Sequence, residues 1–345
     1  MTETRCSIRS SGAVVLDKAV ACDGFYGDAA VRLQTHVHDD HMGGFETSEG
    51  SQRIFCLPGT WALLVAERNG TLDVRSNFKA VQTAAPFRVL NGPIITLRDS
   101  GHMLGSAQVE VEHVDGYRAG YSGDFAWPIA DVIQVDELVV DSTYGSPDSN
   151  RLYSQEQAED AFIERVFTNA KVGPVYVRAF RGTLQRALAA LTEAGCAFPI
   201  LASRPQLSEA AVYRREGFSI GALIAADSED GEAAKAQGRF VLVEGRGDRQ
   251  PMNRPQGYSI KLSAFYANPR EPVTHFSDRD CEVAISNHAD FGGTLDYVAA
   301  TGAKVVLTDN VRGPHGVDLA LELSRRLGVT AIPASPENSE RAWGA

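Results

Sequence analysis

Residues 35–41 place three histidines and two aspartates within seven residues of a chain that has only eight histidines in all. Neutral imidazole nitrogens and carboxylate oxygens are ligands that zinc and similar divalent ions accept. A solvated polar loop is the alternative, but it does not explain so many ligand groups in one short segment. We therefore predict that this segment binds metal, and that it holds ligands for two ions.

The order of the residues in this segment suggests how two ions are shared. His36 and His38 are two positions apart, so in an extended backbone their side chains point the same way and can bind one ion together. Asp40 and His41 follow at a turn into two glycines, which permit sharp bending of the backbone. This second pair can therefore face a second ion nearby.

Two later segments supply further ligand groups. His102 lies between glycines just before residues 108–112, whose alternating pattern predicts a strand. Asp124 follows the next short strand, where a loop carboxylate can bridge two cations. An isolated histidine or strand-end aspartate is more often structural, and it is their order after residues 35–41 that favours a metal site.

With these segments in this order, the chain resembles the metallo-β-lactamase fold and, within it, the β-CASP nucleases. The matching motifs are THVHDDH at 35–41, SGHMLGSA at 100–107, YSGDF at 121–125, DSTYG at 141–145 and SNHADF at 286–291. They span nearly the whole chain. The resemblance implies an α/β fold: an αββα metallo-β-lactamase sandwich with an inserted α/β β-CASP domain.

The resemblance also implies roles for individual residues. It assigns the first ion to His36, His38 and His102, the second ion to Asp40 and His41, and the position between them to Asp124. Asp28 resembles the family's strand-end aspartate that orients the metal loop through hydrogen bonds. Asp141 and His288 match the acidic residue and histidine that distinguish the nucleases, so we expect them to act in catalysis with Asp40.

One position departs from the family's pattern. Many β-CASP enzymes have a further metal-binding histidine after the strand at residues 305–308, but here that strand runs into Asp309. Either Asp309 replaces the histidine as an oxygen ligand, or His315 reaches back, or the second site is weaker. We favour Asp309. The DNA crosslink-repair branch also lacks the histidine, so its loss does not argue against activity.

The pattern of elements predicts two domains formed from three segments. Residues 1–148 are β-rich and form the first part of a metallo-β-lactamase domain, and residues 278–345 return to it. Between them, residues 149–277 alternate strands and helices as a parallel α/β unit does. A capping box at 154–157 marks the start of the first helix of this insert. A chain of 345 residues with 43% hydrophobic residues can form both cores.

The composition of the chain limits which partners and which cellular compartment we expect. The chain begins without an apolar signal region and has no apolar stretch long enough for a membrane, so we expect a cytoplasmic protein. Five widely spaced cysteines fit reduced thiols. The net charge of −11 is unusual for a protein that binds a phosphate backbone, although two divalent cations would offset it locally. Candidate phosphate contacts are Arg178, Arg181, Arg246, Arg249 and Arg254.

We expect a nuclease that uses two divalent ions, Zn²⁺ or alternatively Mn²⁺, to hydrolyse phosphodiester bonds. The resemblance to ligase-associated DNA exonucleases favours DNA over RNA, 5′ polarity, and a DNA-repair or ligase partner. An RNA-processing nuclease is the alternative within the family. A small-molecule hydrolase such as a lactonase or thioesterase would share the metal motif, and a pseudo-nuclease scaffold is the non-enzymatic possibility. The oligomeric state is not predicted.

Overall fold

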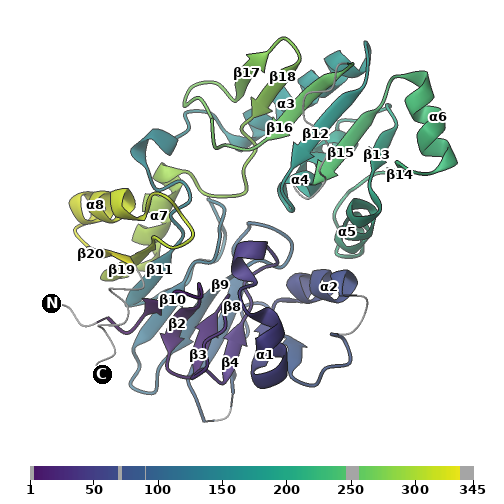
Figure 1. The fold of residues 1–345 in the computed structure, drawn as a ribbon. Coiled ribbons are helices and arrows are strands. Elements are labelled where there is room, and N and C mark those ends of the chain that lie inside the picture. The colour runs from purple at the N-terminus through teal and green to yellow at the C-terminus, as the bar shows by residue number, and fades with distance from the viewer. Residues whose placement is uncertain (1–3, 69–71, 90, 246–255, 335–345) are drawn as a thin grey trace. The chain divides into compact units, whose positions relative to one another are not determined.

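The fold was analysed in a computed structural model, which describes residues 4–68, 72–89, 91–245 and 256–334. The chain divides into two compact units (Figure 1). The first combines Met1–Asn150 with His288–Ala345, and the second is the continuous segment Arg151–Asn287. Three of the predicted phosphate contacts, Arg246, Arg249 and Arg254, lie outside the described residues.

The first unit contains two β-sheets, and each is antiparallel at one side and parallel at the other. The first sheet runs in the order β1 (Ser7–Ile8), β2 (Val14–Asp17), β3 (Val20–Cys22), β4 (Val31–Leu33), β5 (Arg53–Cys56) and β6 (Phe78–Ala80). The second runs in the order β20 (Thr330–Ala334), β19 (Val305–Asp309), β11 (Glu137–Val140), β10 (Arg118–Tyr121), β9 (Ala107–Glu112), β8 (Ile94–Asp99) and β7 (Phe87–Arg88).

The two sheets pack face to face around one hydrophobic core. Alternate residues of β2, such as Val14 and Leu16, enter this core together with Val109 and Val111 of β9. The other face of the second sheet packs against α7 (Phe291–Thr301) and α8 (Gly316–Leu327) in a separate cluster. On the first sheet, α1 (Phe45–Ser51) packs beside β5, and α2 (Pro58–Glu67) beside β6. The central strands of both sheets can therefore bury both of their faces, whereas the edge strands β6 and β7 keep exposed residues.

The second unit is a single seven-stranded sheet with helices. The sheet runs in the order β14 (Ile224–Ala225), β13 (Ile200–Ala202), β15 (Val241–Gly245), β12 (Val175–Ala179), β16 (Tyr258–Leu262), β18 (Asp280–Val283) and β17 (Val273–Ser277). All neighbouring strands are parallel except β17 and β18. The helices are α3 (Gln155–Ala170), α4 (Thr183–Glu193), α5 (Arg204–Arg215) and α6 (Glu229–Gln237).

The expected α/β class and the alternation of strands and helices in the second unit are confirmed. The capping box is also confirmed, because the Ser154 hydroxyl accepts a hydrogen bond from the Gln157 backbone N–H and the Gln157 side chain accepts one from Ser154. The assignment of the units as a metallo-β-lactamase domain and a β-CASP insert stays a prediction. No helix in the described part of the chain is long and apolar enough to span a membrane.

Candidate metal centre

The candidate ligands lie on loops that meet at one edge of the first unit. Strands β10, β11 and β19 are parallel, so Asp124, Asp141 and the end of β19 leave the second sheet on the same side. The loop between β8 and β9, which carries His102, joins them because β9 is antiparallel to β10. The metal loop, defined here as residues 35–44, follows β4 of the first sheet. The Thr35 carbonyl accepts a hydrogen bond from the Ala107 backbone N–H, at the start of β9.

Four side chains form the first ligand group: His36, His38, His102 and Asp124. Nε2 of His36 and Nε2 of His102 lie 3.1 and 3.2 Å from Nδ1 of His38. The Oδ2 atom of Asp124 lies 3.4 Å from the first of these and 3.7 Å from the second. A tetrahedral ion bound at about 2.0–2.1 Å would have ligands about 3.3–3.4 Å apart. Four of the six distances among these atoms are therefore within about 0.4 Å of the edges of such a tetrahedral site.

The protonation states of this group suit a cation. Burial lowers the pKa of His36 and that of His102, which keeps both imidazoles neutral. Burial alone would raise the pKa of Asp124, but His41, His36 and His288 hold it well below its usual range. Metal ligands must be neutral imidazoles and ionised carboxylates, and these groups already have that form.

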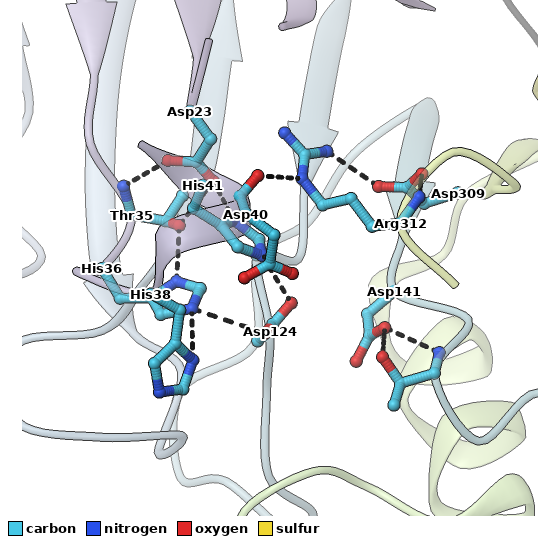
Figure 2. Close-up of polar contacts among 12 residues, drawn as sticks. Asp23, Thr35, His36, His38, Asp40, His41, Asp124, Asp141, Asp309 and Arg312 are labelled. Atoms are coloured by element: carbon cyan, nitrogen blue, oxygen red, sulfur yellow. Dashed lines mark hydrogen bonds and ion pairs between the residues drawn. The ribbon is translucent and has the colours of Figure 1, made fainter. Parts of the chain in front are cut away.

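His41 and Asp40 provide a second position beside the first. Nε2 of His41 lies 3.3 Å from Oδ1 of Asp124 and 3.7 Å from a carboxylate oxygen of Asp40, so Asp124 faces both positions (Figure 2). This Nε2 atom is buried and makes no hydrogen bond within the described residues. Burial lowers the pKa of His41, but Asp124 and Asp23 outweigh it and raise the pKa to about 10. The surroundings of Nε2 thus favour a positive charge there.

Asp23, not Asp28, orients the metal loop. The buried Asp23 carboxylate accepts hydrogen bonds from the Thr35 backbone N–H at 2.8 Å and the Thr35 hydroxyl at 2.6 Å, and it lies 2.8 Å from Nδ1 of His41. Asp28 is exposed and accepts a hydrogen bond from the Tyr26 hydroxyl. The expectation for Asp28 was therefore wrong. The signal for Asp23 was present, because it directly follows the short apolar run of residues 20–22.

A glycine fixes the position of Asp124. Gly123 has a φ of 54°, in the left-handed region that glycine adopts at little cost. A Cβ atom at this position would lie 2.5 Å from the carbonyl oxygen of Ala107 and so would clash. The close approach of the two backbones aims the next side chain, Asp124, at the histidines.

Asp141 and His288 form a third group with Asp124. Nδ1 of His288 donates a hydrogen bond to Oδ2 of Asp141 at 2.8 Å, and Nε2 lies 3.8 Å from Asp124. Burial lowers the pKa of His288, but Asp141 and Asp124 outweigh this effect and raise it. Asp141 itself is held by a short turn, since it accepts hydrogen bonds from the backbone and hydroxyl of Thr143. The motifs at 141–145 and 286–291 thus converge on the first ligand group.

Among the described residues, Asp309 does not lie in the candidate ligand groups. Its carboxylate pairs with the Arg312 guanidinium at 2.9 Å and accepts the backbone N–H groups of Val311 and Arg312. His315 stands at the start of α8, where Nδ1 lies 3.7 Å from Asp318. Among the described residues, neither belongs to a group of three or more side chains placed to hold a metal ion; Asp40 is in no such group either, but its carboxylate lies 3.7 Å from Nε2 of His41. The preference for Asp309 as a ligand is therefore corrected: Arg312 occupies its carboxylate.

The remaining predicted phosphate contacts lie in the second unit. Arg178 on β12 forms an ion pair with Glu244 at 3.2 Å, and Arg181 pairs with Glu209 at the same distance. Both guanidinium groups are thus partly neutralised by carboxylates. Their proposed contact with phosphate stays a prediction.

No family model matches the chain. An uncharacterised protein in the lig 3′ region of Acidianus ambivalens is 35% identical over 109 residues, which are 31% of this chain and 77% of that protein. The RNase J-like protein of Methanocaldococcus jannaschii is 28% identical over 135 residues, 33% of this chain and 32% of that protein. A probable DNA ligase of Opitutus terrae is 23% identical over 290 residues, 79% of this chain but 26% of that protein.

The chain thus spans about a third of the Methanocaldococcus relative and about a quarter of the Opitutus relative. Among solved structures, a protein of unknown function from Enterococcus faecalis V583 has a TM-score of 0.54 at 11% identity. The match covers 89% of this chain and 79% of that one. At this identity the likeness concerns the fold alone.

Proposed function

We propose that this chain, which belongs to the same family as the uncharacterised Acidianus ambivalens protein, is a metal-dependent nuclease that hydrolyses phosphodiester bonds. One observation carries the proposal. Three imidazole nitrogens and one carboxylate oxygen lie at tetrahedral spacing, and the unbonded, buried Nε2 of His41 faces the same carboxylate, Asp124. Such a set of donors has no evident structural purpose without cations.

Two divalent cations fit the donors. His36, His38, His102 and Asp124 would hold one, and His41, Asp40 and Asp124 would hold the other. Nitrogen and oxygen donors at this spacing suit Zn²⁺, with Mn²⁺ as the alternative. When bound, such ions polarise a phosphoryl oxygen and promote the attack of water.

The side chains around the donors have roles of their own. Hydrogen bonding to Asp141 fixes the His288 ring, so that Nε2 is directed toward the site and can donate a hydrogen bond or a proton to a phosphate or leaving oxygen. Asp40 has a side chain that is 62% exposed, so its carboxylate is within reach of solvent and can accept a proton from the attacking water. Asp23 keeps Nδ1 of His41 occupied, so that Nε2 faces the site.

The pair of Asp141 and His288 favours a nuclease over a lactonase or thioesterase. A phosphodiester is negatively charged already in its ground state, so a cationic histidine can bind it, whereas a neutral ester develops negative charge only in the transition state. The second unit, with its parallel sheet, supports the assignment of a β-CASP insert within a metallo-β-lactamase sandwich. A small-molecule hydrolase has no need of such an additional unit.

DNA is the substrate we propose, with attack from the 5′ end. A region similar to most of this chain occurs within the Opitutus terrae protein named as a probable DNA ligase, which supports DNA and a ligase partner. The RNase J-like name of the Methanocaldococcus jannaschii relative supports RNA as the second candidate. The longer extent of the first match is the reason for preferring DNA.

The class of reaction is tested by comparing purified protein, with Zn²⁺, Mn²⁺ or chelator, on bis-p-nitrophenyl phosphate and on a panel of lactones and thioesters. We expect the protein to hydrolyse the phosphodiester in a reaction that chelator stops, and to hydrolyse none of the lactones or thioesters. Activity on the esters alone would reject the nuclease. Labelled single-stranded DNA and RNA of one sequence then distinguish the two polymers.

A further inference from the structure

Arg312 connects the turn after β19 to the metal loop and to the turn before β2. Its side chain is only 9% exposed. Nε donates a hydrogen bond to the backbone carbonyl of Asp40 at 3.1 Å, Nη1 pairs with Asp309 at 2.9 Å, and Nη2 donates to the carbonyl of Gly12. One guanidinium thus joins three parts of the first unit that are far apart in sequence, and Figure 2 shows its contacts with Asp40 and Asp309.

A second arginine holds the same loop from the first sheet. Arg32 on β4 is fully buried, and its guanidinium donates hydrogen bonds to the carbonyls of His41 and Gly43. The carbonyls of three residues between 40 and 43 are therefore bound to guanidinium groups. The side chains of Asp40 and His41 face the ligand group.

The two arginines differ in what anchors them. Within the described residues, the hydrogen bonds of Arg32 go to neutral oxygens, including those of Gln34 and Ser48. Arg312 instead has a buried carboxylate, Asp309, whose side chain is 4% exposed. Asp309 is itself held by the backbone N–H groups of Val311 and Arg312. Two backbone N–H groups fix the Asp309 carboxylate, and this carboxylate in turn orients the planar guanidinium group of Arg312. Arg312 can therefore hold the metal loop rigidly.

We propose that Arg312 is a positioning residue for the second metal position, because it holds the backbone of Asp40 in place. Asp309 acts only through Arg312. Among the described residues, the second position has the side chains of Asp40, His41 and Asp124, while the first has four donors. The second ion binds more weakly than the first, and its affinity depends on Arg312. This inference rests on the proposed metal-dependent function.

The test is a titration of the metal-free full chain with Zn²⁺, followed by calorimetry, with ions counted by native mass spectrometry. Wild-type protein is expected to bind two ions with unequal affinities. Arg312→Met should lower the affinity for the second ion about 10- to 100-fold and leave the affinity for the first ion unchanged. A loss of this size is typical when a residue that holds a metal ligand in place is replaced. Arg312→Lys should recover part of the loss. Arg325→Met is the matched control. Among the described residues, the ion pair of Arg325 is with Glu322 on α8, so this substitution should change neither affinity.

Asp309→Asn/Arg312→Met removes both buried charges, so it keeps the test valid if the single variant does not fold. Its second-ion affinity should equal that of Arg312→Met, because Asp309 is not a ligand. The inference would be overturned if the second ion bound Arg312→Met as tightly as it binds the wild type. It would also be overturned if the double variant bound the second ion more weakly than Arg312→Met does. Wild-type protein that binds no Zn²⁺ at all would instead reject the proposed function.

Discussion

The Oδ2 atom of Asp23 lies 2.8 Å from Nδ1 of His41, and both side chains are buried. The contact fixes which ring nitrogen of His41 remains for the metal position. It also places a carboxylate behind the imidazole, which raises the basicity of a metal ligand. From the sequence we expected this role for Asp28, but Asp28 is exposed, whereas Asp23 is buried.

Asp23→Asn should therefore lower Zn²⁺ affinity at the second position about 10- to 100-fold, because the amide cannot support His41 as an anion does. Asp28→Asn is the control and should leave both affinities unchanged, since Asp28 is exposed and bonds only to Tyr26. Calorimetry on both variants measures the difference. Equal effects of the two substitutions would contradict the assignment of Asp23.

His36→Ala should remove one donor of the first ligand group and reduce phosphodiester hydrolysis to background. The ring is fully buried, so the melting temperature is recorded alongside the metal content. His275→Ala serves as the control, because His275 is exposed on β17 of the second unit. A folded His36→Ala protein that retains turnover would refute the metal assignment.

His288→Asn should lower kcat about 10²- to 10⁴-fold, the usual contribution of a positioned acid or hydrogen-bond donor, while both ions stay bound. Asp141→Asn should lower kcat by a smaller factor. The two substitutions combined should be no worse than His288→Asn alone, because Asp141 acts through the His288 ring. His315→Ala should leave rate and metal content unchanged. Loss of metal from His288→Asn would show a ligand rather than a catalytic residue.

A charge pair between the two sheets gives the fold a defined pH response. Asp17, at the end of β2, lies 3.2 Å from Nδ1 of His113, which follows β9. The hydrogen bond with His113 outweighs partial burial and holds the pKa of Asp17 below its ordinary value. A lowered folded-state pKa stabilises the fold above the unfolded pKa of about 3.9, and this stabilisation is lost as pH falls through the folded pKa.

Asp17→Asn should accordingly cost about 1 kcal/mol or less of unfolding free energy at about pH 6, and this cost should shrink as the pH falls through the folded-state pKa of Asp17. Urea denaturation of wild type and variant at several pH values measures the difference. A constant difference across the range would mean that packing, and not the charge, accounts for the effect.

The sequence was sufficient to predict the first ligand group, because residues 35–41 are dense in histidine and the other ligands follow strands in a recognisable order. It also gave the α/β class and the helix start at Ser154, where local hydrogen bonds suffice. The helix start depends on near neighbours in the chain. The grouping of His36, His38, His102 and Asp124 was instead expected from the resemblance of their motifs to those of a known family.

The contacts of Asp23 and Asp309 could not be found in this way. Asp23 follows a strand and Asp309 ends one, and neither position shows which partner the carboxylate meets: His41 for Asp23, and Arg312 for Asp309. Arg312 is only three positions after Asp309, yet it also contacts Gly12 and Asp40, which lie 300 and 272 positions earlier in the chain. Nothing in the local pattern distinguishes a carboxylate that binds a metal from one that a guanidinium occupies.

The most direct test of the account is the digestion of 5′- and 3′-labelled single-stranded DNA by wild-type and His36→Ala protein, with Zn²⁺ or Mn²⁺ and with chelator. The account predicts stepwise shortening from the 5′ end by wild type that chelator stops and that the variant lacks. Cleavage that persists in chelator and in the variant would contradict a metal-dependent nuclease.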